Sequence, residues 1–595
     1  MTGSDRKEKI VLFFLLGLVG IVLFVTAIRG PFIIDEINYL VTVVGLRHGT
    51  LFVPGTEGLT PSRELVAFDP DAQKRIVTAT PVFSVVPPLY APIALPFLLL
   101  GWHGLVLLNI LSYLIAAFVA FTFLRSYATD LQTRWIGIAL ALLGGFGIEY
   151  AQGVWPHMLS VALVVSAVYA ASRVWRNESV GMALVSGLII GTASGIRGQD
   201  IMFAGGIGLT MLLFSRRRIL SSSLFAAGAA LPLSIIASMY YLTQGLWHPF
   251  PKVIAYSSQV SQGTVHGSIF NPVKAFWIRI VDYSAQPEFT DPILSVLYKK
   301  DPLSGAMLIT GIVKKSLLQS SPWIAVALVV LAFVWISGSS FKDEARKTLR
   351  ALSLITFPMI LVIVMTGVGR SDGLAYNQRY FLEIVPLLAI GLLIALDEMK
   401  SRVPLVLSGL LGAGFIYAIV LALPSRTLYQ MALVNVPLAL ALFFLVGWMF
   451  RGSVRVRFLM PVALGLCLGW SAFVHVLDDL PASRARRSRN AALVSELESA
   501  LPNHSAIFTY GGWRDAAGAV MLTRDVVVLD VGADDGNDCG ILASELEGRR
   551  RSLYVLGDVF PPGAVQRITG GDTLVLKFSR PVPLFELEKK TSIAK

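Results

Sequence analysis

Two adjacent acidic residues, Asp35 and Glu36, are the first side chains in this sequence that suggest chemistry. They open the segment DEINYLVTVVGL, a few residues after an apolar run that extends from Ile10 to Ile28. A carboxylate held near a substrate hydroxyl can accept its proton as a general base. The alternative is structural, because Asp35 could cap the helix that EINYLVTVVGL predicts or lie solvated in a loop. Position alone leaves both interpretations open.

The elements that must hold these acids are mostly membrane helices. The chain has 595 residues, of which 55% are hydrophobic and 15% charged, and its mean hydropathy is +0.68. Apolar runs of the length that a helix needs to cross a bilayer recur along most of it. We therefore expect an α-helical polytopic membrane protein. The net charge of +12 calls for no nucleic-acid partner, since most basic residues lie in short loops between apolar runs.

The distribution of positive charge predicts the topology. Hydropathy gives about 14 candidate spans, the first of which is expected to be a retained signal anchor. Residues 82–100 carry four prolines, so we expect an interfacial helix that does not cross. About 13 spans then remain, with the N-terminus in the cytoplasm and the basic loops at 216–218, 342–350 and 451–457 on the same side. The arginines between 484 and 489 are an exception, because they would lie on the opposite side.

This topology divides the chain into two domains. Residues 1–478 form the transmembrane domain, whose loops 30–81 and 243–322 lie on the extracytoplasmic face of the inner (plasma) membrane. Residues 479–595 differ in character, with a polar helical stretch, NAALVSELESAL, and β-like runs AIFTY, DVVVLDV and SLYVLGDV. Strand-like runs that alternate with helical ones predict a small extracytoplasmic α/β domain.

Two motifs resemble those of a known superfamily. Asp35-Glu36-x-x-Tyr39, followed by Pro87-Pro88-Leu89, is similar to the first extracytoplasmic loop of the GT-C glycosyltransferases. The closest likeness is to the branch of the protein O-mannosyltransferases and the lipid A aminoarabinose transferase. The segment NQRYFLEIVPLLAIGL, Asn377 to Leu392, is similar to a late span of the same branch.

The resemblance implies an inverting transfer of a sugar from a polyprenyl-phosphate donor to a hydroxyl of an envelope lipid, glycan or protein. It makes Asp35 the general base and Glu36 a residue that orients the acceptor or Asp35, although the two roles could be exchanged. Tyr39 and Tyr380, within the two motifs, become substrate-binding candidates.

Two arginines are candidates for binding the donor phosphate. Arg197, in SGIRGQD, matches a basic residue of the superfamily in a short outer turn, and Arg379, in YNQRYF, lies at the outer end of a span. A leaving phosphate needs cationic or hydrogen-bonding donors. The alternative for each is an arginine that merely extends its charge to the membrane surface.

The sequence departs from the superfamily pattern at two places. Val86 precedes the Pro-Pro pair, where a lysine or histidine is usual, and His157 stands where a carboxylate is usual. Glu149 could supply the missing carboxylate, and His157 could bind phosphate or relay a proton. No cofactor is specified, and a divalent cation is left open. In the long loop, Trp247, His248, Tyr256 and His266 could line an acceptor groove or simply lie at the membrane interface.

Two other functions remain open. The number of spans also fits a transporter or flippase, but this chain lacks the two-fold hydropathy repeat and the buried mid-membrane acids that such proteins tend to have. The missing basic residue before Pro87 also fits a non-catalytic assembly subunit with the same fold.

Overall fold

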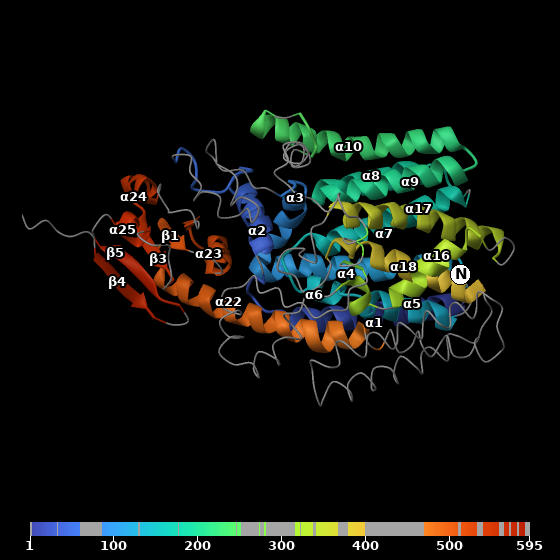
Figure 1. Cartoon of the computed structure of the whole chain (residues 1–595), viewed down its shortest axis with the longest axis horizontal. Helices are drawn as coiled ribbons and strands as arrows, with labels where there is room; N and C mark the ends of the chain where they lie inside the picture. Colours follow the sequence, from blue (N-terminus) through green and yellow to red (C-terminus); the bar gives the residue numbers. More distant parts are fainter. Residues whose placement is uncertain are drawn as a thin grey trace, which may run out of the picture.

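The computed structural model describes residues 3–32, 34–59, 86–128, 131–176, 178–245, 247–250, 316–321, 323–336, 341–366, 379–398, 471–509, 513–531, 539–557, 564–569, 573–579 and 582–588, with single positions at 273, 276, 279, 280 and 469. Three sets of expectations lie outside these residues: the spans at 403–423 and 431–450, most of the span at 459–476, and Tyr256 and His266. The described elements form a bundle of helices and a smaller α/β domain at the C-terminal end of the chain (Figure 1).

The bundle contains helices that run side by side (Figure 1). They are α1 (Gly3–Val25), α4 (Gly101–Arg125), α5 (Leu131–Leu143), α7 (His157–Trp175), α8 (Met182–Ile196), α9 (Ile201–Phe214), α10 (Arg218–Gln244), α16 (Trp323–Phe333), α17 (Asp343–Thr366) and α18 (Ile384–Glu398). In the described part of the chain, five helical stretches are long and apolar enough to cross a membrane, at Lys7–Val25, Tyr90–Arg125, His157–Trp175, Arg218–Leu242 and Asp343–Val364. The expected polytopic helical fold is confirmed, whereas the number of about 13 spans stays a prediction.

Helix α2 (Ile34–Arg47) carries the acid pair in its first turn. It lies across one end of the bundle, between the bundle and the α/β domain (Figure 1). Its apolar residues are buried, including Ile37, Leu40 and Val41. Because the helix begins at Ile34, Asp35 lies within the first turn, where a negative charge is favoured by the helix dipole.

In the described residues between α2 and α4, which resume at residue 86, the chain forms two short helical segments, α3 (Tyr90–Ala94) of five residues and the 3₁₀ helix η3 (Leu95–Leu100) of six. Gly101 then has a φ of +59°, which glycine adopts without strain, and the chain turns there into α4. These two segments together are shorter than the roughly 20 residues that a helix needs to cross a bilayer.

The α/β domain contains a five-stranded mixed sheet in the order β2-β1-β3-β5-β4. The strands β1 (Ser505–Thr509), β2 (Val526–Asp530) and β3 (Ser552–Leu556) are parallel, as successive strands linked by helices should be, and they confirm the three β-like runs of the sequence. The strands β4 (Thr573–Phe578) and β5 (Leu584–Glu588) add an antiparallel pair. The short helices of the domain are α23 (Arg514–Ala519), η10 (Val520–Leu522), α24 (Cys539–Gly548) and α25 (Ala564–Thr569).

Helix α22 (Leu480–Ala500) runs from the bundle to the α/β domain, where it contacts α23 and η10 (Figure 1). A single hydrophobic cluster extends from bundle residues through Leu493 and Leu497 of α22 to the sheet domain. We refer to the end of the bundle that this domain covers as the domain end. α2 and α3 lie there, as do the first residues of α7 and the last residues of α8.

Candidate active site

Asp35 and Arg379 form an ion pair at the domain end. Asp35 comes from the first turn of α2, and Arg379 begins the short 3₁₀ helix η7 (Arg379–Phe381) that precedes α18. The Asp35 side chain keeps 18% of its surface exposed and that of Arg379 keeps 11%. Asp35 therefore remains partly accessible to a bound molecule, whereas Arg379 is largely buried.

Tyr380 brings the two predicted phosphate-binding arginines together. The guanidinium carbon of Arg379 lies 5.2 Å from the centre of the Tyr380 ring, and that of Arg197 lies 5.9 Å from it. Arg379 also donates a hydrogen bond of 3.4 Å to the Tyr380 hydroxyl. Residues almost two hundred positions apart in the sequence thus form one cationic site around an aromatic ring.

Tyr39, the last residue of the D-E-x-x-Y motif, lies close to this site. Its ring contacts the ring of Tyr90 edge to face, with centres 5.2 Å apart. Burial raises the pKa of the Tyr39 hydroxyl above its ordinary value, and the charge of Arg197 opposes that shift. The hydroxyl therefore stays protonated at neutral pH and can donate a hydrogen bond.

Arg197 has an acidic partner in Glu383, which lies four residues after Arg379. The Ser160 hydroxyl of α7 lies 2.9 Å from Oε1 of Glu383 and also contacts Oδ2 of Asp200, in the turn between α8 and α9. All of these side chains are buried. A hydroxyl has one proton to donate, so it cannot bond to two ionised carboxylates at once. Because Glu383 faces Arg197, Asp200 is the acid that we expect to hold a proton.

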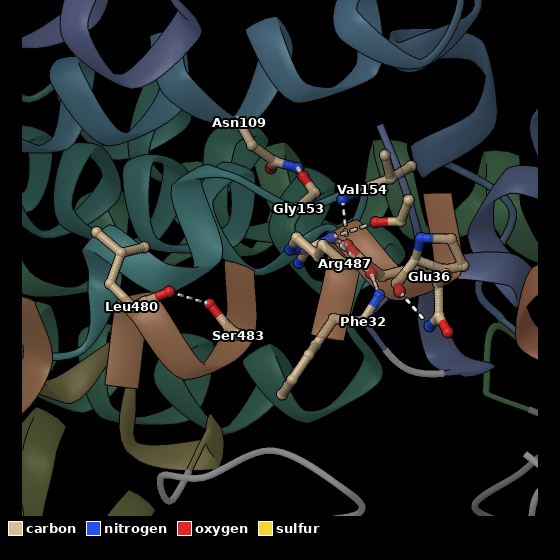
Figure 2. A network of polar contacts seen from close by, with 11 residues as sticks. Phe32, Glu36, Asn109, Gly153, Val154, Leu480, Ser483 and Arg487 are labelled. Carbon is tan, nitrogen blue, oxygen red and sulfur yellow. Dashed lines mark hydrogen bonds and ion pairs between the residues drawn. The ribbon is translucent and has the colours of Figure 1, made fainter. Parts of the chain in front are cut away.

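Glu36 has quite different surroundings from Asp35, because its side chain is completely buried (Figure 2). Nη1 of Arg487, from α22, lies 3.0 and 2.9 Å from the two carboxylate oxygens of Glu36. The backbone N–H of Val154 donates to Oε1 over 2.6 Å, and that of Phe32 donates to Oε2. This carboxylate is thus fully occupied by protein groups.

The chain around Gly153 fits closely against this buried pair. The Gly153 carbonyl accepts a 2.6 Å hydrogen bond from Asn109 of α4 (Figure 2). A Cβ on Gly153 would lie 2.5 Å from Oε1 of Glu36 and 1.9 Å from Nε1 of Trp155. Only glycine leaves room for the Glu36 carboxylate here.

His157 and Glu149 are both buried on the bundle side of this region. His157 begins α7, and its ring packs against Tyr150 and Trp155, with centres 5.1 and 5.5 Å away. Glu149 belongs to the short helix α6 (Gly147–Ala151). Among the residues that the structure describes, no three His, Cys, Asp or Glu side chains lie close enough to hold a metal ion.

Of the four candidates in the long loop, Trp247 and His248 lie among the described residues. Trp247 is exposed, and its ring lies 5.9 Å from that of Tyr241 on α10. Nδ1 of His248 accepts a 2.9 Å hydrogen bond from the backbone of Phe250.

Apolar helices, a cluster of arginines and acids at one end, and a small α/β domain over that end define a polytopic membrane protein. The solved structure of ArnT from Cupriavidus metallidurans bound to undecaprenyl phosphate is similar over 96% of this chain and 97% of its own, with a TM-score of 0.50 and 14% identity. ArnT in the apo state is similar over 98% of both chains, with a TM-score of 0.51 and 13% identity. At this identity the likeness shows the fold.

A more distant structure is that of the oligosaccharyltransferase AglB from Archaeoglobus fulgidus in complex with an inhibitory peptide and a dolichol-phosphate. It covers all of this chain and 75% of its own, with a TM-score of 0.44 and 10% identity. No family model and no curated protein matches the sequence. The expected resemblance to the GT-C superfamily, and to the ArnT branch in particular, is confirmed by the fold.

Sequence reasoning missed four residues of this region. Glu383 and Asp200 could have been noticed, because each follows a predicted arginine by three or four residues. Ser160 had no feature that distinguished it. Arg487 belongs to the arginine cluster that is the exception to the predicted topology. Its ion pair with the buried Glu36 explains why an arginine stands at this position.

Proposed function

We propose that this protein transfers a sugar from a polyprenyl-phosphate donor to a hydroxyl of an envelope lipid, glycan or protein acceptor. The observation that carries the proposal is the pair of arginines around Tyr380, directly beside the accessible carboxylate of Asp35. An anion site next to a carboxylate is what the reaction requires, because a phosphate leaves while a hydroxyl loses its proton. The GT-C fold supports the same reading.

In the proposed reaction the donor phosphate binds between Arg197 and Arg379. The acceptor oxygen attacks the anomeric carbon from the face opposite the phosphate, and the bond from that carbon to the phosphate oxygen breaks. The acceptor proton passes to Asp35, which later releases it to water. The products are the glycoside, with inverted configuration, and the polyprenyl phosphate, whose charge the arginines stabilise.

The ion pair between Asp35 and Arg379 favours an order of steps in which the donor binds before the acceptor reacts. A carboxylate paired with an arginine is a weak base, because the cation stabilises its ionised form. When the phosphate draws Arg379 away, Asp35 loses its partner and becomes a stronger base. Donor binding would thereby prepare Asp35 for the acceptor.

Charge at the other end of the bundle supports an extracytoplasmic site. That end holds the starts of α1 and α5, which the pair of Glu8 and Arg134 joins at 2.9 Å, and the start of α17, where Lys342 pairs with Glu398 of α18 at 3.2 Å. The basic residues at these helix starts outnumber the acids, and they are Lys7, Lys9, Arg134, Lys342, Arg346 and Lys347. Positive residues concentrate on the cytoplasmic side of membrane proteins. The domain end and its acid–arginine cluster would then face away from the cytoplasm.

Mass spectrometry of envelope lipids and glycans provides the test. Cells that contain the protein should carry a sugar modification that disappears on deletion and is not restored by Asp35→Asn. Restoration by Glu344→Gln, which changes an exposed acid at the start of α17, is the control. An Asp35→Asn protein that restores the modification fully would contradict the assignment of Asp35 as the base.

A non-catalytic subunit with this fold is the second candidate. The observation in its favour is that Asp35 is already paired with Arg379, while Val86 replaces the usual basic residue. This candidate predicts binding of undecaprenyl phosphate by the purified protein without any change in envelope glycans. Movement of a labelled polyprenyl lipid across proteoliposomes without donor consumption would instead favour a transporter.

A further inference from the structure

We propose that the C-terminal domain positions the catalytic helix α2, and that Arg487 is the positioning residue through which it acts on Asp35. This inference rests on the proposed function, since it assigns a role in that reaction to a side chain outside the reacting cluster. The evidence is that the domain and its linking helix α22 hold α2 at both of its ends.

The first attachment lies at the start of α2. Nη1 of Arg487 donates to the Glu36 carboxylate and also to the carbonyl of Gly30, over 3.0 Å. Three residues further along α22, Asn490 donates a 2.7 Å hydrogen bond to the carbonyl of Pro31. A Cβ on Gly30 would lie 2.3 Å from the backbone oxygen of Arg487, so the two backbones are in direct contact.

The second attachment lies beyond the end of α2, in residues 51–59. Leu59 is buried in the hydrophobic core of the sheet domain. Arg549, which follows α24, donates a 2.5 Å hydrogen bond to the carbonyl of Glu57. Gly55 has a φ of +84°, and a Cβ there would lie 2.5 Å from a methyl group of Val527 in β2. This part of the chain is thus docked on the sheet.

Between the attachments, α2 packs against α23 and η10 of the same domain. The helix that carries Asp35 is therefore framed by one domain along its whole length. We call these three contacts, at Arg487, at residues 51–59 and along α23 and η10, the α2 clamp.

The clamp matters to the chemistry because Glu36 and Asp35 are consecutive residues of one helical turn. Glu36 is completely buried and is held by Arg487, so it fixes the rotation and the axial position of that turn. A displacement of a reacting group by about 1 Å can lower a rate by about a hundredfold. Loss of Arg487 would release the turn and shift Asp35 from Arg379 and the acceptor.

The experiment uses the full chain in lipid nanodiscs with Arg487→Met, Glu36→Gln and the double variant. Arg489→Met, two residues further along α22 at a half-buried position, is the matched control. Hydrogen–deuterium exchange of residues 34–47 reports the position of α2 without any substrate. Thermal unfolding and the rate of transfer to the envelope acceptor are measured on the same samples.

We expect exchange in residues 34–47 to rise about tenfold in Arg487→Met and to stay unchanged in Arg489→Met. The transfer rate should fall about a hundredfold at saturating donor, while the KM for the donor changes little. In the double variant, which leaves no unpaired buried charge, thermal stability should recover but the rate should not. Recovery of stability without recovery of the transfer rate would distinguish a positioning role of Arg487 from a purely structural one.

Recovery of the rate together with stability in the double variant would overturn the proposal. Unchanged exchange and an unchanged rate in Arg487→Met would overturn it as well. If the unaltered protein transfers no sugar but exchange responds to Arg487→Met as expected, the α2 clamp holds and the proposed reaction fails.

Discussion

Replacing Asp35 with asparagine should abolish transfer and at the same time tighten the binding of the lipid phosphate. The structure pairs Asp35 with Arg379, so the acid competes with a phosphate for the same guanidinium group. Asparagine keeps the size of the side chain and removes its charge. Arg379 can then bind the phosphate without first breaking its ion pair with residue 35.

Both effects can be given a size. The Asp35 side chain is partly exposed whereas Arg379 is largely buried, so the ion pair should contribute at least about 1 kcal/mol, the upper value for an exposed pair. Its removal should strengthen the binding of undecaprenyl phosphate about fivefold. Loss of a general base lowers a rate by roughly 10²- to 10⁴-fold. The melting temperature should fall modestly, because the largely buried Arg379 loses its charge partner but keeps its contact with the Tyr380 ring.

The assay is equilibrium binding of radiolabelled undecaprenyl phosphate to the protein in nanodiscs, followed by transfer measured on the same preparation. Glu344→Gln is again the control, and it should alter neither quantity. Weaker binding by the Asp35→Asn protein would show that the acid does not compete with the phosphate. Transfer at the unaltered rate would show that Asp35 is not the base.

The buried groups yield two further predictions. Gly153→Ala places a Cβ 2.5 Å from the Glu36 carboxylate and should destabilise the protein by about 2 kcal/mol in thermal unfolding, whereas Gly205→Ala, with nothing within 4 Å, should be neutral or slightly stabilising. Asp200→Asn should leave the melting temperature nearly unchanged, because an amide can replace a protonated acid as a donor to the Ser160 hydroxyl. Glu383→Gln leaves the buried Arg197 without its charge partner and should lower the free energy of unfolding by about 3 kcal/mol. Equal losses of stability in Asp200→Asn and Glu383→Gln would contradict the assignment of the proton to Asp200.

The sequence predicted the elements whose pattern is local. The apolar runs gave membrane helices, and the run DVVVLDV became β2 of the sheet domain. The D-E-x-x-Y motif marked the helix that carries Asp35. Each of these follows from neighbouring residues, because hydrophobic periodicity and strand composition are properties of a short segment.

The partners of the charged residues could not be predicted in the same way. Arg487 is 451 residues from Glu36, and Arg197 is 186 residues from Glu383. An ion pair leaves no periodic pattern in the sequence, so nothing local distinguishes a buried arginine from one that extends to the membrane surface. The sequence also could not show that Glu36 is buried while Asp35 stays partly exposed. That difference depends on α22, whose Arg487 pairs with Glu36.

The existing ion pairs also explain how arginines near a membrane surface could remain selective. A lone arginine in this position would attract any lipid phosphate. Here Arg379 is paired with Asp35 and Arg197 with Glu383, so each must give up a carboxylate before it binds another anion. A ligand that reaches only one arginine recovers little of that cost. In the proposed reaction, a phosphate that fits beside Tyr380 would contact both arginines at once and be favoured, so the acids would act as a filter in addition to the proposed role of Asp35 as base.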